Sequence, residues 1–250
     1  MFLLARRFVN FLTNVRPSRN LSLISDLAWT SASNWPAGGE IDIVEGVHNQ
    51  TSNQSTLHTN PGCKLDTTNF NPDPNILVSG NTFVGKVLSD NCDANLNFNA
   101  GCGIKDEDKR SYGFGLATVG GGVFATLWDD KGIKICRHSL HIGNPPPLSH
   151  IDTRSCLGFF PRAEVPEDVK SEAPNPSSWP APKSFWSAST CPIRQFFKDH
   201  SFIINTTLCG DLGEATYASA GCPGTCAQQV ADPANFKQAK WKINYLRVYQ

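Results

Sequence analysis

The hexapeptide Glu-Ile-Asp-Ile-Val-Glu that begins at Glu40 places three carboxylates in one β-branched run. Because side chains on a regular strand alternate between two faces, Glu40 and Asp42 would share one face and Glu45 would point to the other. A single bulge residue at Ile43 or Val44 would return Glu45 to the first face, since two residues then oppose one on the neighbouring strand. The spacing therefore predicts a bulged strand with all three acids on one surface.

Three carboxylates on one surface repel each other, so the arrangement lowers stability and is expected mainly where it serves a function. Retaining glycosidases use two carboxylates about 5–5.5 Å apart, one as nucleophile and one as acid/base. Glu40 and Glu45 could lean together in this way, and Asp42 between them could hydrogen-bond the nucleophile and separate the proton affinities of the two glutamates. On spacing alone, a solvated acidic edge and a structural Ca²⁺ site remain alternatives.

Two tryptophans precede the acidic segment, and a histidine follows it. Trp29 and Trp35 could stack on the apolar face of a sugar ring, although Trp35 could equally belong to the core. His58 lies in a segment that could pair with the acidic strand. Because a lone histidine is more often a structural hydrogen-bonding residue than a catalyst, we expect His58 to have that role near the site.

Strand patterns dominate the elements that must position these residues. The run 39–47, bounded by glycines, predicts a strand, and the segment 123–135 predicts a hairpin that turns at Asp129-Asp130-Lys131-Gly132. The segment 241–249 predicts a terminal strand. Two short helices are expected, one over 193–198 and one that begins at Asp232 as N-cap with Pro233 next. The proline-rich segment 145–182 predicts a long loop.

Composition favours a single all-β domain. The chain has 250 residues, 20 glycines and 17 prolines, and its 18% charged residues balance at 22 basic against 22 acidic. A balanced charge argues against nucleic acid or an anionic membrane surface as partner. No apolar run approaches the roughly 20 residues of a membrane-spanning helix.

The nine cysteines favour an oxidising compartment. The chain also carries glycosylation sequons at Asn20, Asn49, Asn53 and Asn205. The N-terminus is not a convincing signal peptide, because Arg6 and Arg7 interrupt its short apolar run.

With these motifs in view, the sequence resembles glycoside hydrolase family 16, in its fungal-type branch of secreted laminarinase-like β-glucanases. The resemblance spans residues 28–250. It is carried by the following stretches: Trp29-Thr30, Asn34-Trp35-Pro36, Gly39 to Gly46, Thr56-Leu57-His58-Thr59, Asn91-Cys92-Asp93, Gly101-Cys102-Gly103, Gly120 to Thr126, Gly132 to Ile135, Phe202 to Asp211 and Trp241 to Gln250.

The resemblance implies a concanavalin-like jelly-roll sandwich and endo-hydrolysis of β-1,3 or mixed β-1,3/1,4 glucan with retention. Glu40 would be the nucleophile, Asp42 the assisting carboxylate and Glu45 the acid/base. Trp35 and His58 would contact the substrate or the surroundings of the nucleophile, and Trp29 would also bind the substrate. It further implies no metal or cofactor, a β-glucan as partner, a monomeric state and secretion.

The chain departs from the family pattern in two places. Several strands precede the acidic motif in the family, whereas residues 1–27 match nothing here, so we expect an incomplete catalytic domain over 28–250 that lacks N-terminal strands and could be inactive. Residues 136–157 look inserted. Two alternatives to a hydrolase follow, a non-catalytic glucan-binding sandwich and a cell-wall transglycosylase that passes the covalent intermediate to a sugar hydroxyl.

Overall fold

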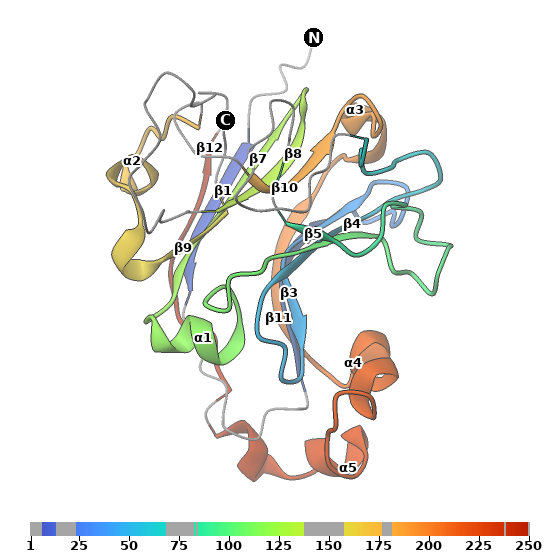
Figure 1. Cartoon of the computed structure of the whole chain (residues 1–250), viewed down its shortest axis with the longest axis vertical. Coiled ribbons are helices and arrows are strands. Elements are labelled where there is room, and N and C mark those ends of the chain that lie inside the picture. The colour runs from blue at the N-terminus through green and yellow to red at the C-terminus, as the bar shows by residue number, and fades with distance from the viewer. Residues whose placement is uncertain are drawn as a thin grey trace.

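Two six-stranded sheets pack face to face as a β-sandwich in the computed structural model (Figure 1). The structure describes residues 7–13, 24–68, 83, 85–137, 158–176, 182–237 and 239–249. Strand pairing is antiparallel throughout the described residues except between β8 and β9. The all-β sandwich that the sequence analysis expected is therefore confirmed.

Sheet A has the strand order β10-β8-β9-β7-β1-β12. Its strands are β1 (Arg7–Thr13), β7 (Gly122–Asp129), β8 (Gly132–Arg137), β9 (Gly158–Pro161), β10 (Pro182–Ser187) and β12 (Ile243–Tyr249). Sheet B has the order β11-β2-β3-β4-β6-β5. Its strands are β2 (Ile24–Ser31), β3 (Glu40–Val47), β4 (Gln54–His58), β5 (Lys86–Val87), β6 (Cys102–Lys105) and β11 (Ser201–Leu208).

The main core lies between the two sheets. Sheet B contributes Ile41 and Leu57, and sheet A contributes Phe124 and Trp186, all of them almost fully buried. Burial of each such side chain stabilises the fold by about 1.5–3 kcal/mol. The indole nitrogen of Trp186 also donates a hydrogen bond to the carbonyl of Cys102 across the interface. Apolar side chains thus occupy the inner face of β3, and the acids are left for its other face.

The outer face of sheet A is covered by a second apolar cluster. Val123 and Phe160 of the sheet pack there with Val165 and Val169, which lie in and beside α2 (Glu167–Lys170). Figure 1 shows α2 outside sheet A, on the side away from sheet B. Apolar side chains of β7 and β9 thus cover both faces of this part of sheet A, whereas the face of sheet B away from the core is polar.

Short helices occupy the ends of the sheets. They are α1 (Gly113–Thr118), α3 (Ile193–Phe196), α4 (Gly210–Tyr217), α5 (Cys226–Val230) and the 3₁₀ helices η2 (Arg162–Glu164) and η3 (Pro233–Phe236). The two predicted helices are confirmed as α3 and η3, and Asp232 caps η3 by accepting a hydrogen bond from the Ala234 amide. None of the helices in the described ranges is long and apolar enough to span a bilayer.

The prediction of a continuous loop over 145–182 was wrong in its second half. Residues 158–161 form β9, which pairs with both β7 and β8, and η2 and α2 follow it. Proline lacks a backbone N–H group, and three prolines of this segment lie at element ends, where that group is not required. They are Pro161 at the end of β9, Pro166 as N-cap of α2 and Pro182 at the start of β10. Residues 138–157, which hold most of the expected insertion, lie outside the described residues.

The segment 1–27, for which the sequence analysis found no match to the family pattern, contains strand residues. Strand β1 pairs antiparallel with β7 on one side and with β12 on the other, and β2 begins within the same segment at Ile24. Sequence analysis had assigned no element to this part of the chain. The expectation of missing N-terminal strands stays a prediction.

Three disulfides join cysteines of the described residues. Cys63–Cys191 and Cys92–Cys102 lie in the main core, and Cys209–Cys226 links the start of α4 to α5. Cys222 is a half-buried free thiol in the same helical region.

Candidate active site

Strand β3 contains the predicted bulge, and its register places the extra residue at Ile43. Against β2, Asp42 lies opposite Trp29 and Val44 lies opposite Ala28, so two steps along β3 match one step along β2. Against β4, Asp42 pairs with Thr56 and Glu45 pairs with Gln54, so three steps match two. Both neighbouring strands therefore show one extra residue between Asp42 and Glu45, and the predicted bulge is confirmed.

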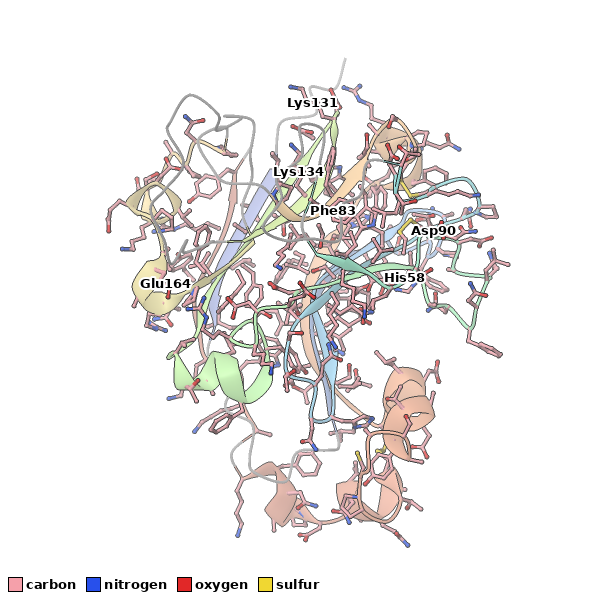
Figure 2. All side chains as sticks on the ribbon, in the orientation of Figure 1. His58, Phe83, Asp90, Lys131, Lys134 and Glu164 are labelled. Carbon is pink, nitrogen blue, oxygen red and sulfur yellow. A yellow bond between two sulfur atoms is a disulfide. The ribbon has the colours of Figure 1, made fainter. Side chains whose placement is uncertain are left out.

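Because of the bulge, the three acids lie on the same face of sheet B. This face is polar, and its rows follow from the strand register. Glu40, Asp42 and Glu45 of β3 lie beside Ser31, Trp29 and Leu27 of β2 and beside His58, Thr56 and Gln54 of β4. In Figure 2, His58 lies on the sheet B side of the molecule, whereas Glu164 lies on the opposite side of the sandwich, beyond sheet A.

Glu45 is held by two side chains of β4. Its Oε2 atom accepts hydrogen bonds from the Thr56 hydroxyl at 2.6 Å and from the Gln54 amide at 3.2 Å. The Gln54 amide also donates to the Thr56 hydroxyl at 3.0 Å. Burial raises the pKa of Glu45, and the hydrogen bond from Thr56 offsets part of that rise. A buried carboxyl with a raised pKa is suited to hold and deliver a proton.

Asp42 and His58 form a buried pair. The Nε2 atom of His58 lies 3.3 Å from the Asp42 carboxylate, and its Nδ1 atom is within 2.8 Å of the Asn99 side-chain oxygen. Burial lowers the pKa of His58, but the hydrogen bond and charge of Asp42, together with Glu40 and Glu45, outweigh it and raise the pKa to about 9. The predicted structural role of His58 is consistent with this geometry, because the ring orients the central carboxylate.

Glu40 lies at the start of β3 and is less buried than the other two acids. Burial and the neighbouring charge of Asp42 raise its pKa to about 8, and a hydrogen bond from the Trp35 side chain opposes that rise. Burial raises the pKa of Asp42 as well, and the neighbouring charge of Glu45 adds to that rise.

An open groove of about 420 Å³ lies beside Glu40. Trp29 and Trp35 line it together with Ser201 and Ile203 of β11. Trp35 is 44% exposed, which excludes the alternative that it is a core residue. The groove offers the flat aromatic surfaces that a sugar ring requires, next to the carboxylate that would attack it.

Trp29 is oriented by a residue that is distant in the sequence. Its indole nitrogen donates a 2.8 Å hydrogen bond to the Asn205 side-chain oxygen, and the amide of Asn205 donates to the Thr207 hydroxyl. The Trp29 ring is half-buried, so its position in the groove depends on the pairing of β2 with β11.

The same groups could in principle hold a metal ion. Glu40, Asp42 and His58 offer ligand atoms that lie within 4.8 Å of one another. Calcium prefers oxygen ligands, whereas His58 would offer a nitrogen. The Nε2 atom of His58 lies 3.3 Å from the Asp42 carboxylate, so these groups can also form an internal ion pair.

The structure brings together all six residues that the sequence predicted for the site, namely Glu40, Asp42, Glu45, Trp29, Trp35 and His58. Sequence analysis missed Gln54, Thr56 and Asn99, which contact these residues. Alternation along β4 carried a signal for the first two, because Gln54, Thr56 and His58 are spaced two apart and so share a face.

A β-sandwich that gathers three carboxylates beside an aromatic groove on one sheet has the architecture of a carbohydrate-active catalytic domain. The chain matches the family model described as "XgeA-like, catalytic GH16 domain" over residues 27–142 and 156–249. It belongs to glycoside hydrolase family 16, and it carries the catalytic domain of that family.

Individual relatives agree with this assignment. The chain is 37% identical over 226 residues to a "probable glycosidase" of Schizosaccharomyces pombe. The aligned region covers 89% of this chain and 46% of that protein. The chain spans less than half the length of the curated relatives that it matches first.

Two solved structures share the fold closely. One is laminarinase 16A of Phanerochaete chrysosporium with two β-glucans in its donor and acceptor sites, at 31% identity and a TM-score of 0.79, covering 98% of this chain and 73% of that chain. The other is an elongating β-1,3-glucosyltransferase of the same family, at 30% identity and a TM-score of 0.77, covering 99% and 73%.

Proposed function

We propose that this protein is a retaining endo-β-glucanase that cleaves β-1,3 linkages, alone or in mixed β-1,3/1,4 glucan. The observation that carries the proposal is the bulge at Ile43, because it gathers Glu40, Asp42 and Glu45 on one face of sheet B. Family membership and the β-glucan complex of the related laminarinase support the substrate class. The disulfides support an extracellular setting.

The reaction proceeds by double displacement. Glu45 donates its proton to the glycosidic oxygen while the Glu40 carboxylate attacks the anomeric carbon, so the glycosidic bond breaks and an ester to Glu40 forms. Glu45, now ionised, removes a proton from water, and the resulting attack on the anomeric carbon releases Glu40. Asp42 lies between the two glutamates on the same face of β3, and His58 balances its charge.

A second candidate activity is transglycosylation. The glucosyltransferase of known structure belongs to the same family and shares this fold. In that reaction a sugar hydroxyl replaces water as the acceptor of the covalent intermediate. Hydrolysis and transfer then use the same two glutamates and differ only in what enters the groove.

The decisive experiment compares wild type with Glu40→Gln and Glu45→Gln. Wild type should release reducing sugars from laminarin, with the β-anomer appearing first by NMR, and each variant should lose at least about 10³-fold in rate. Glu167→Gln is the matched control, because Glu167 is exposed on α2, which lies outside sheet A on the side away from sheet B. EDTA should leave the rate unchanged.

Other outcomes would replace the proposal. Laminarin binding without sugar release by wild type would indicate a glucan-binding sandwich. Products longer than the starting oligosaccharide would indicate transfer. An initial α-anomer would exclude the double displacement.

A further inference from the structure

The bulge in β3 creates a local backbone problem. An extra residue in one strand interrupts the ladder, so backbone groups there lose their regular partners on the neighbouring strand. The residues concerned, Ile43 and Val44, are almost fully buried, and water cannot serve their backbone groups freely. Buried backbone donors and acceptors almost always have partners, so another group must supply them here.

Asn53 supplies partners on both sides of the bulge. Its side-chain oxygen accepts a 3.0 Å hydrogen bond from the Glu45 amide, and its side-chain nitrogen donates a 2.8 Å hydrogen bond to the Ile43 carbonyl. The side-chain amide of Asn53 thus forms hydrogen bonds with β3 immediately before and immediately after Val44. These bonds take the place of the interrupted ladder.

Asn53 is itself held in place. Its side chain is buried, with 4% exposed. Its backbone amide donates to the Ser111 hydroxyl at 2.9 Å, and its carbonyl accepts from the Asp106 amide at 2.8 Å. The Ser55 hydroxyl adds a second donor to the Ile43 carbonyl at 3.1 Å. The grip on β3 is therefore anchored to the segment that follows β6.

We infer that Asn53 is a positioning residue, whose amide holds the bulge in the register that places Glu45 beside Asp42 and Glu40. This inference rests on the proposed function, because it assigns Asn53 to the placement of the acid/base. Asn53 is also part of a sequon, but a glycan would replace one of the two side-chain N–H groups, which donate to Ile43 and Ser55, and it would not fit beside a residue that is 4% exposed.

Loss of the Asn53 hydrogen bonds should affect Glu45 and Glu40 differently. Glu45 lies directly after the bulge and its own amide is bonded to Asn53, whereas Glu40 precedes the bulge and is positioned by its pairing with His58. Loss of the Asn53 grip should displace Glu45 and leave Glu40 and the groove in place. A displacement of about 1 Å at a reacting group can cost about 10²-fold in rate.

The test uses Asn53→Asp, which keeps the size of the side chain and the acceptor for the Glu45 amide but removes the donor to Ile43. On laminarin, kcat should fall by about 10²-fold with KM within about twofold. A dinitrophenyl β-glucan oligosaccharide needs no acid to release its leaving group. Its burst of dinitrophenol should therefore keep the wild-type rate in this variant, and azide should speed the later turnover.

Asn49→Asp is the matched control. Asn49 is the other sequon asparagine close to β3, and it is exposed in the turn after that strand. This control should behave as wild type on both substrates. A folded Asn53→Asp protein that equals the control on laminarin, or that loses laminarin and dinitrophenyl activity equally, would overturn the inference.

Ser55→Ala provides a second variant if Asn53→Asp does not fold. It removes one of the two donors to the Ile43 carbonyl, so it should show a smaller loss, of about tenfold, with the same split between substrates. Wild-type rates on both substrates in Ser55→Ala would overturn the inference. If wild type itself cleaves neither substrate, the proposed function fails first, and that outcome is distinct from a failure of the Asn53 variants alone.

Discussion

Thr56→Val tests how the site sets the proton affinity of Glu45. The Thr56 side chain is fully buried, and its hydroxyl donates the 2.6 Å hydrogen bond to the Glu45 carboxylate. Valine has nearly the same shape as threonine and a high strand propensity, so the substitution removes the hydroxyl and changes little else. Glu45 keeps the longer 3.2 Å hydrogen bond from Gln54.

The magnitude follows from the strength of that bond. A hydrogen bond to a charged group contributes about 1.5–3 kcal/mol, and one pKa unit corresponds to about 1.4 kcal/mol. The bond from Thr56 stabilises the ionised form of Glu45, so it lowers the pKa of a group whose pKa burial has already raised. Its removal should raise the pKa of Glu45 further, by about 1–2 units.

The assay is the pH dependence of kcat/KM for sugar release from laminarin. The general acid must be protonated in the free enzyme, so the basic limb of this profile reports its pKa. For Thr56→Val the basic limb should move upward by about 1–2 pH units. Thr126→Val is the matched control, because Thr126 is a buried threonine of sheet A whose hydroxyl has no hydrogen-bond partner among the described residues.

The reasoning would be refuted by a folded Thr56→Val protein whose basic limb coincides with that of wild type. Such a result would mean either that Glu45 is not the acid or that the short hydrogen bond does not control its ionisation. A downward shift would contradict the sign of the argument directly. A shift of equal size in the Thr126→Val control would show that the effect is not local to the site.

Two further predictions concern stability, measured by denaturant unfolding. Burial raises the pKa of Asp26 to about 6 from an ordinary value near 3.8. The contribution of Asp26 to the free energy of unfolding is therefore greatest at low pH and is lost as the pH rises toward and through 6. Between about pH 4 and pH 8, wild type should lose about 2 kcal/mol of stability relative to Asp26→Asn. Parallel pH curves for the two proteins would contradict this. Lys183 and Asp106 form a buried ion pair at 3.1 Å between the two sheets, so Lys183→Met should cost about 3–5 kcal/mol, because the buried Asp106 carboxylate loses its countercharge. Adding Asp106→Asn to that variant should recover much of the loss, and a double variant as unstable as the single one would argue against charge burial as the cause.

The sequence was sufficient to predict much of the fold and of the site. The acidic strand, the hairpin of β7 and β8, the strand β12 and the helices α3 and η3 all follow local patterns, and each was predicted. The three acids and their common face could be predicted because the period of a strand is two residues, and one extra residue reverses the parity.

Other elements could not be predicted because their signals are weak or non-local. Helix α5 has only five residues, and β9 has only four, in a segment whose prolines indicated a loop. The strand β1 belongs to a segment for which the sequence analysis found no family match, and its place in sheet A depends on one partner in the middle of the chain and one near its C-terminal end.

The sequence by itself determined which chemical groups the site contains and the parity that puts Glu40, Asp42 and Glu45 on one face. Only the tertiary structure decided their environment. Trp29 depends on Asn205, which is 176 residues away in the chain, and the sequon at Asn53 proved to be the amide that holds the bulge. The physical reason is that alternation along a strand is a local property of the backbone, whereas burial, hydrogen-bond partners and pKa values arise only when separate strands pair.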